Sequence, residues 1–205
     1  MDPLAIYEDL KDKIIWLDFK PGSTLNLAAL SNAYQVSRNP VTIALTRLDA
    51  EEWVVRNGSH FVVSPLTVDR IREITEIRSV MEVRANLWAM QRMDDQGLAM
   101  LNALRDEILT LRDGASNREI VELDVKFHHL LYKETRNKQL TTMLDRMLSH
   151  YLRFWLSSPN PIKREAFFKD EIEIIKALET KDEARLETAT SAHIKASLDE
   201  IMGLS

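Results

Sequence analysis

Residues 25–55 decide the fold, and they run LNLAALSNAYQVSRNPVTIALTRLDAEEWVV. Asn26 is placed to cap a first short helix, because its side-chain oxygen can accept from free backbone N–H groups. A tight turn over residues 35–39 follows, and Asn39 before Pro40 starts a second helix, since proline at the first helical position gives up a donor that has no partner there. Helical spacing then turns four residues inward: Val41, Ala44, Leu45 and Leu48.

The outward face of this second helix carries short polar and cationic residues, with one isoleucine among them. They are Arg38, Asn39, Thr42, Ile43, Thr46 and Arg47. A small helix pair of this kind is typical of a helix-turn-helix, whose second helix enters the major groove of DNA. On spacing alone, an ordinary αα-hairpin is as good an interpretation.

The residues that follow favour the first interpretation. Two β-rich runs, residues 52–56 and 61–63, flank Asn57-Gly58, which is the strongest two-residue hairpin signal. An amphipathic helix over residues 4–17 precedes the pair. Helix, helix and hairpin in this order predict a winged helix-turn-helix.

In these residues the chain resembles the GntR family of bacterial transcription regulators. The resemblance rests on Tyr7, Leu10, Lys20-Pro21-Gly22, Leu25, Leu30, residues 36–41, Ala44-Leu45 and Arg47-Leu48. It implies binding of double-stranded operator DNA through Ser37, Arg38, Asn39, Thr42, Thr46, Arg47 and Arg56. This chain departs from the family pattern at two places. Thr42-Ile43 replaces the Arg-Glu that usually follows Pro-Val. Asn-Gly-Ser-His, at residues 57–60, replaces the usual Arg-Gly at the tip of the wing.

Composition limits the class of protein. The chain has 205 residues, no cysteine, 45% hydrophobic residues and a net charge of −5. It therefore lacks disulfides and thiolate metal sites, and it has no secretory signal or apolar run of about 20 residues, so we expect a cytoplasmic protein. Residues 1–66 hold six Lys/Arg against eight Asp/Glu. With so few cations we expect modest affinity for each half-site and reliance on a homodimer.

Ser64-Pro65 is a predicted linker, because proline keeps its predecessor out of the α region. We expect a winged helix-turn-helix domain over 1–66 and an effector-binding and dimerisation domain over 67–205. The sequence of residues 67–205 predicts about six helices with short connections, which together form an all-α antiparallel bundle. Their expected ranges are 67–93, 98–111, 117–135, 140–158, 162–180 and 182 to nearly the end. The whole chain is thus predicted to be mainly α.

A helical bundle after such a winged helix resembles the effector domain of the FadR branch, called FCD. The matching residues are Arg78 with Glu82, Asp124, Phe127-His128, Asn137, Ala177-Leu178 and His193. The resemblance implies that the bundle binds a small organic acid. Arg78 and Arg153 are candidates to hold an anionic effector, although ordinary salt bridges explain them as well.

Asp124 and His128 lie four residues apart on one predicted helix, so both side chains point the same way. Such a pair is half of a metal site, or simply a hydrogen-bonded pair. The family resemblance implies two further ligands from the last two helices, where His193 matches one and Glu171 replaces the other histidine. Oxygen and imidazole ligands would suit a divalent transition metal such as Zn, Mn, Fe or Ni.

The sequence therefore predicts a ligand-responsive transcription regulator, a repressor rather than an enzyme. One alternative is a metal sensor in which the ion itself is the effector. Another is a metal-dependent hydrolase or lyase, which needs a separate general base that the sequence does not offer beside the four candidate ligands.

Overall fold

A computed structural model describes residues 1–203 of the chain. They form two compact units, Met1–Thr67 and Val68 onwards, each with its own core. Across the described residues, no helix combines the length and the apolar character that crossing a membrane requires.

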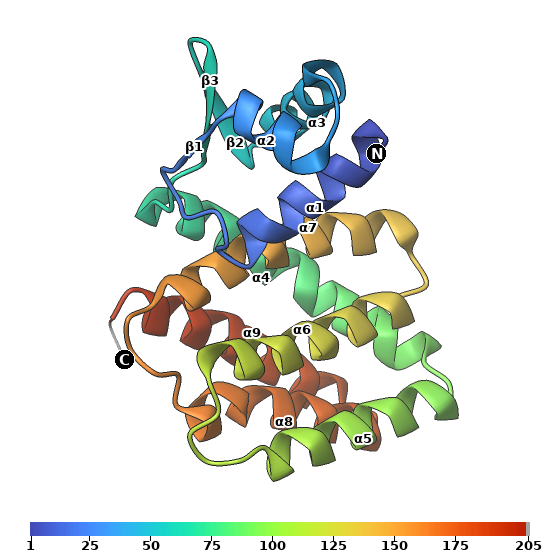
Figure 1. Ribbon diagram of the computed structural model, residues 1–205. Coiled ribbons are helices and arrows are strands. Elements are labelled where there is room, and N and C mark those ends of the chain that lie inside the picture. Colours follow the sequence, from blue (N-terminus) through green and yellow to red (C-terminus); the bar gives the residue numbers. More distant parts are fainter. Residues whose placement is uncertain (204–205) are drawn as a thin grey trace. The chain divides into compact units, whose positions relative to one another are not determined.

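The first unit combines three helices with a small antiparallel sheet (Figure 1). The helices are α1 (Pro3–Ile15), α2 (Leu27–Tyr34) and α3 (Arg38–Ala50), and the strands are β1 (Thr24–Leu25), β2 (Val54–Asn57) and β3 (His60–Val63). The strand order is β1-β3-β2, so β3 is the central strand. This is the predicted winged helix-turn-helix. β1 was not predicted, because a two-residue strand is too short to show an alternating pattern.

Local capping explains where the helices of this unit begin. The Asn26 side chain accepts from the Ala29 N–H at 3.0 Å, which confirms the predicted cap of α2. The predicted start of α3 at Pro40 was wrong, because α3 begins at Arg38 with Ser37 as the preceding residue. Proline is tolerated throughout the first turn, since none of the first backbone N–H groups of a helix has an intrahelical partner.

The predicted hairpin is present, but its turn lies one residue further along the chain. Asn57 pairs with His60, so the two central residues are Gly58 and Ser59 rather than Asn57 and Gly58. Gly58 has a φ of 61°, and Ser59 is not among the residues with positive φ. Positive φ at the first central residue alone is the pattern of a type II′ hairpin, which requires glycine there.

The core of the first unit joins its helices to the wing. Leu10, Val41, Leu45, Leu48 and Trp53 are completely buried. Three of them lie on one face of α3, so that the opposite face of α3 is left for solvent. The buried set on α3 is the one that the helical spacing predicts.

The second unit consists, within the described residues, of six helices (Figure 1). They are α4 (Val68–Arg92), α5 (Asp95–Thr110), α6 (Asn117–Glu134), α7 (Lys138–Ser157), α8 (Arg164–Thr180) and α9 (Glu183–Ile201). The long α4 packs against α6, α7 and α9, and α8 packs against α9. The predicted fold class, mainly α with a helical bundle after the wing, is confirmed.

Side-chain caps fix the ends of the bundle helices. Ser116 and Glu119 form a capping box at the start of α6. Asp94, Asn137 and Asp182 cap the starts of α5, α7 and α9. A cap fixes the first turn of a helix, and with it the rotation of every side chain along that helix. α6 and α9 carry the side chains of the candidate metal site.

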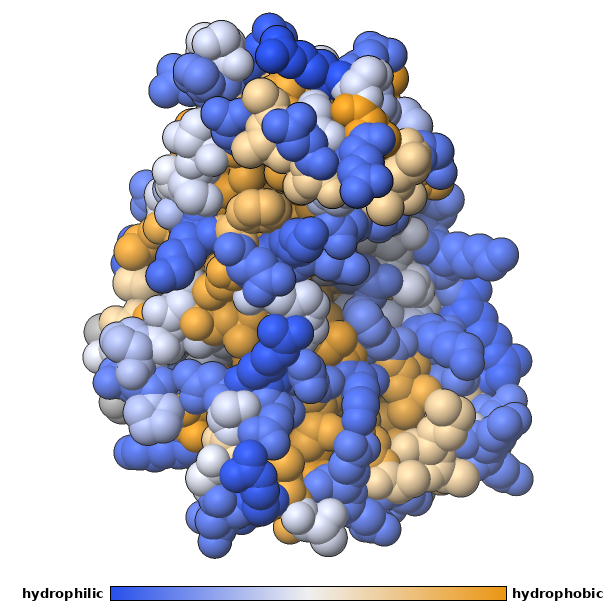
Figure 2. Space-filling view, viewed as in Figure 1, coloured by the Kyte–Doolittle hydropathy of each residue, from blue (hydrophilic) through white to orange (hydrophobic). Residues whose placement is uncertain are grey.

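The bundle surface is polar with apolar strips between the helices. In Figure 2, apolar side chains are exposed across the lower part of the view, where α5 and α6 lie in Figure 1. A shallow groove of about 530 Å³ lies there, and its lining includes Met100, Leu104 and Leu130. Lys126 and Lys133 also line this groove.

Candidate functional site

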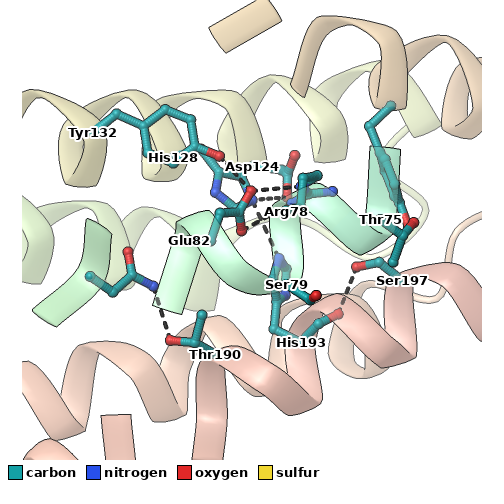
Figure 3. Close-up of polar contacts among 12 residues, drawn as sticks. Thr75, Arg78, Ser79, Glu82, Asp124, His128, Tyr132, Thr190, His193 and Ser197 are labelled. Atoms are coloured by element: carbon teal, nitrogen blue, oxygen red, sulfur yellow. Dashed lines mark hydrogen bonds and ion pairs between the residues drawn. The ribbon is translucent and has the colours of Figure 1, made fainter. Parts of the chain in front are cut away.

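Three buried side chains from two helices meet inside the bundle (Figure 3). Asp124 and His128 come from α6, and His193 comes from α9. One ligand atom from each lies within 4.8 Å of the other two. The Nε2 atoms of His128 and His193 are 3.3 Å apart, and the His128 Nε2 is 3.5 Å from the Asp124 Oδ1. The structure thus brings together three of the four residues that the sequence suggested as ligands.

Packing holds the imidazole of His128 in place. The Phe127 ring meets it edge-on at a centroid distance of 5.3 Å, and the Tyr132 ring lies at 5.5 Å. Asp124 and Tyr132 are each four residues from His128 on α6, so all three side chains share one face of the helix. The cluster is therefore preorganised by the helix and its aromatic neighbours.

The protonation states of the cluster suit a cation. Burial, and then the neighbouring His128, lower the pKa of His193 to about 4. Although burial raises the pKa of Asp124, His128 lowers it, and the net pKa of this carboxyl is below its ordinary value. Near neutral pH, His193 is therefore a neutral imidazole with an available lone pair, and Asp124 is an anion.

Glu171, on α8, lies outside this three-residue cluster and next to Asp124. Its side chain is completely buried, and among the described residues neither of its carboxyl oxygens has a hydrogen-bond partner. Burial and the Asp124 carboxylate raise the pKa of Glu171 well above its ordinary value. A buried polar group with no partner is costly, and proteins keep few of them. Glu171 is thus a buried acid that interacts with Asp124 at the edge of the cluster.

The donor set of the cluster fits a divalent metal ion. Two ligands that are each about 2.1 Å from one metal ion lie about 3.0–3.4 Å apart in octahedral or tetrahedral geometry. The 3.3 Å between the two histidine Nε2 atoms falls in that range. Two imidazoles and a carboxylate are ligands that Zn, Mn, Fe and Ni accept. Asp124, His128 and His193 would hold the ion, with Glu171 as an additional oxygen donor beside Asp124.

Arg78 lies beside this cluster but is already paired (Figure 3). Its Nε and Nη2 donate to the two carboxylate oxygens of Glu82 at 2.6 and 3.2 Å. Although burial alone lowers the pKa of Arg78, Glu82 raises it, while Arg78 holds the pKa of the buried Glu82 at about 2. The guanidinium also stacks on the Tyr151 ring at 4.3 Å. Of the two interpretations of Arg78, the geometry favours the salt bridge.

Arg153, the other candidate for an anionic effector, is a buried residue of α7. Burial lowers its pKa to about 10, which leaves the guanidinium charged near neutral pH. Arg153 is thus a second buried cation of the bundle, in addition to the paired Arg78.

Two hydrogen bonds of the buried polar network were missed in the sequence. Tyr132 donates to the Glu82 carboxylate at 2.7 Å, and Asn86 donates to the Thr190 hydroxyl at 3.0 Å. Tyr132 lies four residues after His128, and this spacing was the available signal. The bond between Asn86 and Thr190 joins residues 104 positions apart, so no local pattern announces it.

A second candidate site is the outward face of α3. Ser37, Arg38, Asn39, Thr42 and Thr46 are all exposed. Among the described residues the Arg38 guanidinium has no hydrogen bond or ion pair, so it is available to a phosphate or a guanine. Ser37 immediately precedes α3, and the other four residues lie along the helix from Arg38 to Thr46.

Arg47, on the same helix, belongs to a network around Glu51. Its Nε donates to Glu51 at 3.2 Å, and its guanidinium lies over the Tyr7 ring at 3.8 Å. Tyr7 and Trp53 also donate to the Glu51 carboxylate, at 2.5 and 3.3 Å. Half of the Arg47 side chain is nevertheless exposed. It is a fixed cation with part of its surface turned to solvent.

Arg56 lies on the wing, in β2. Its Nε donates to the Gly58 carbonyl at 3.4 Å, and its guanidinium lies 6.0 Å from the Phe61 ring. The side chain therefore lies along its own hairpin. Within residues 1–203, Arg38 is the one of the three predicted DNA-binding arginines whose side chain makes no contact of this kind.

Two family models match the chain over most of its length. The FCD domain model matches residues 73–196. The model described as bacterial regulatory proteins, gntR family, matches residues 4–62. The first match lies within the helical bundle and the second within the winged unit.

Known proteins of the same organisation are similar along the whole chain. An uncharacterised HTH-type transcriptional regulator, YdhC of Bacillus subtilis, is 26% identical over 204 residues, covering 97% of this chain and 90% of that protein. The Nta operon transcriptional regulator of Aminobacter aminovorans is 28% identical over 189 residues, covering 90% and 87%. The solved structure of Escherichia coli McbR/YncC superposes with a TM-score of 0.84 at 21% identity, covering 98% and 97%.

Proposed function

Because the chain belongs to the GntR family of DNA-binding transcription regulators and carries an FCD domain, we propose that it is a ligand-responsive repressor. The winged unit would bind operator DNA, and the bundle would bind the effector and join two copies of the chain. Like its homologues, the chain is a transcription regulator and not an enzyme. The proposed place of action is the cytoplasm, where bacterial operator DNA lies.

The main support for DNA recognition by α3 is that this helix has two different faces, one buried and apolar and one exposed and polar. Val41, Leu45 and Leu48 are completely buried against the rest of the winged unit. The opposite face carries Arg38, which has no side-chain hydrogen bond or ion pair to any residue that the structure describes, together with short polar side chains. Such a face fits the major groove, where arginine binds guanine or phosphate and asparagine binds adenine.

Replacing Arg38 by alanine is expected to weaken operator binding about ten-fold or more per half-site, because a bidentate arginine contributes about 1–3 kcal/mol. Operator duplex is obtained by selection from a randomised library, and affinity is measured by fluorescence anisotropy at physiological salt. Arg72→Ala, which removes an exposed arginine of α4, is the matched control and should leave affinity unchanged. Unchanged affinity of the Arg38 variant would contradict the assignment of α3 as the recognition helix.

A homodimer is proposed because one small module with few cations binds DNA weakly. The bundle offers a surface for it. Ile77 and Val80 of α4 are 46% and 74% exposed, and Met143 of α7 is 51% exposed. α4 and α7 pack together, and exposed large apolar side chains on neighbouring helices are typical of association surfaces.

The proposed effector is a small organic acid bound inside the bundle. Asp124, His128 and His193 would hold a divalent metal ion, and the ion would supply a positive centre for a carboxylate. Arg153 is the buried cation that would attract the remaining negative charge. Glu171 lies next to Asp124, where burial and the Asp124 carboxylate raise its pKa and so disfavour its charged form. Arg78, paired with Glu82, would support the site from outside rather than bind the effector.

Measurements of operator affinity distinguish a repressor that responds to a carboxylate from a regulator that responds to the metal ion itself. Affinity is measured with chelator-treated protein, with Zn²⁺ or Mn²⁺ added, and with the metal plus citrate as a probe carboxylate. For a carboxylate-responsive repressor, the metal alone should leave affinity within about two-fold, and citrate should lower it several-fold, as allosteric couplings of about 1–3 kcal/mol do. A full response to the metal alone would favour the metal sensor instead.

A further inference from the structure

The centre of the outward face of α3 is an uncharged patch of methyl-bearing side chains. Ile43 is 49% exposed there, although α3 has a buried apolar face of its own. A single exposed aliphatic residue is ordinary on a protein surface. Ile43 differs in its position, because Thr42 and Thr46 adjoin it on the outward face and Arg38 and Arg47 lie toward the two ends.

Helical spacing makes this patch continuous. Thr46 lies three residues after Ile43, and Thr42 and Thr46 are four residues apart, so their side chains are neighbours on the helix surface. The Thr42 hydroxyl donates to the Arg38 carbonyl at 3.0 Å. The hydroxyl hydrogen of Thr42 is therefore already used within the helix. What the Thr42 side chain still presents to DNA is its methyl group and the lone pairs of its hydroxyl oxygen.

The major groove contains one apolar group, the C5-methyl of thymine. Guanine is usually bound by arginine or lysine and cytosine by a carboxylate, and the patch of Thr42, Ile43 and Thr46 has neither cation nor carboxylate. We propose that Ile43, flanked by the methyl groups of Thr42 and Thr46, contacts thymine C5-methyl groups and so determines the sequence preference at the centre of each half-site. This inference rests on the proposed role of α3 in operator binding.

The test removes one methyl group from the DNA without changing its base pairing. The purified full-length protein selects its operator from a duplex library with randomised positions. Each thymine of the recovered half-site is then replaced singly by deoxyuridine, which lacks only the C5-methyl. We expect the replacement to weaken wild-type binding about four-fold at one or two adjacent thymines. This factor corresponds to ~0.8 kcal/mol, the contribution of one buried methyl group.

Ile43→Ala should bind the unmodified operator more weakly and should lose its sensitivity to deoxyuridine at those same thymines. The variant should stay folded, because alanine is a better helix former than isoleucine at an exposed position. Leu4→Ala is the matched control, since Leu4 is a 52% exposed aliphatic side chain on α1. This control should keep the wild-type response to each deoxyuridine.

The outcomes separate the inference from the proposed function. Specific operator binding that is insensitive to deoxyuridine at every thymine would overturn the role of Ile43. The same conclusion would follow if Ile43→Ala kept the full wild-type sensitivity. If the wild-type protein enriched no sequence and Arg38→Ala bound DNA as wild type does, the assignment of α3 itself would fail, and the inference with it.

Discussion

Replacing His193 by alanine should reduce the bound transition metal from about one ion per chain to none, because the cluster then keeps only two of its three converging ligands. Metal content is measured by elemental analysis of untagged protein purified without chelator. Wild-type protein should also gain several degrees in its unfolding midpoint on adding Zn²⁺ or Mn²⁺, since an ion that binds only the folded state stabilises it. The His193 variant should show no such gain.

His129→Ala is the matched control for that prediction. His129 adjoins His128 on α6, but its side chain is 54% exposed and points away from the cluster. This variant should keep the wild-type metal content. If wild-type protein refilled with Zn²⁺, Mn²⁺, Fe²⁺ or Ni²⁺ retains no ion after desalting, the metal proposal is wrong, and the cluster is a hydrogen-bonded part of the bundle interior.

Replacing Glu82 by alanine is expected to destabilise the protein by about 3–5 kcal/mol, because it leaves the buried Arg78 guanidinium without its carboxylate. Both side chains of the pair are only 2% exposed, and Tyr132 loses its hydrogen-bond acceptor as well. Domains are typically stable by about 5–15 kcal/mol, so this loss is a large share of the total. Urea unfolding followed by circular dichroism, at one fixed protein concentration, measures it.

The chain contains a matched control for this pair as well. Arg118 and Glu122 have the same residue types and the same four-residue spacing on α6, with Nε 3.0 Å from the carboxylate oxygen. Their side chains are 56% and 47% exposed, so Glu122→Ala should cost less than about 0.5 kcal/mol. The double replacement Arg78→Met with Glu82→Leu should recover much of the loss, because these two positions then bury no unpaired charge. Equal losses for Glu82→Ala and Glu122→Ala would contradict the argument from burial.

Periodic and capping signals accounted for most of the fold. The inward residues of α3, the cap at Asn26 and the helices of the bundle all follow from local spacing. What the sequence did not indicate was β1, the start of α3 at Arg38 and the turn at Gly58-Ser59. These depend on backbone pairing and turn geometry over a few residues, where several arrangements satisfy the same composition.

The candidate sites show the same division between local and distant information. Asp124 and His128 share a helix face, so their convergence was predictable from spacing, and the family resemblance supplied His193. Sequence alone did not decide between two roles for Arg78. The four-residue spacing on α4 allows its pairing with Glu82, but its stacking on Tyr151 depends on the packing of α7 against α4. Nor did it reveal that Glu171 lies outside the cluster, which depends on how α8 packs in the bundle.

The Glu51 carboxylate has a mechanical consequence for regulation. It accepts hydrogen bonds from Tyr7 of α1, Arg47 of α3 and the Trp53 indole just before β2, and so ties the first helix, the recognition helix and the wing into one rigid body. Allosteric coupling of about 1–3 kcal/mol is too small to break several such contacts together with the core beneath them. In the proposed homodimer, the proposed effector would therefore change how the two winged units are spaced along the DNA, and not the shape of either unit.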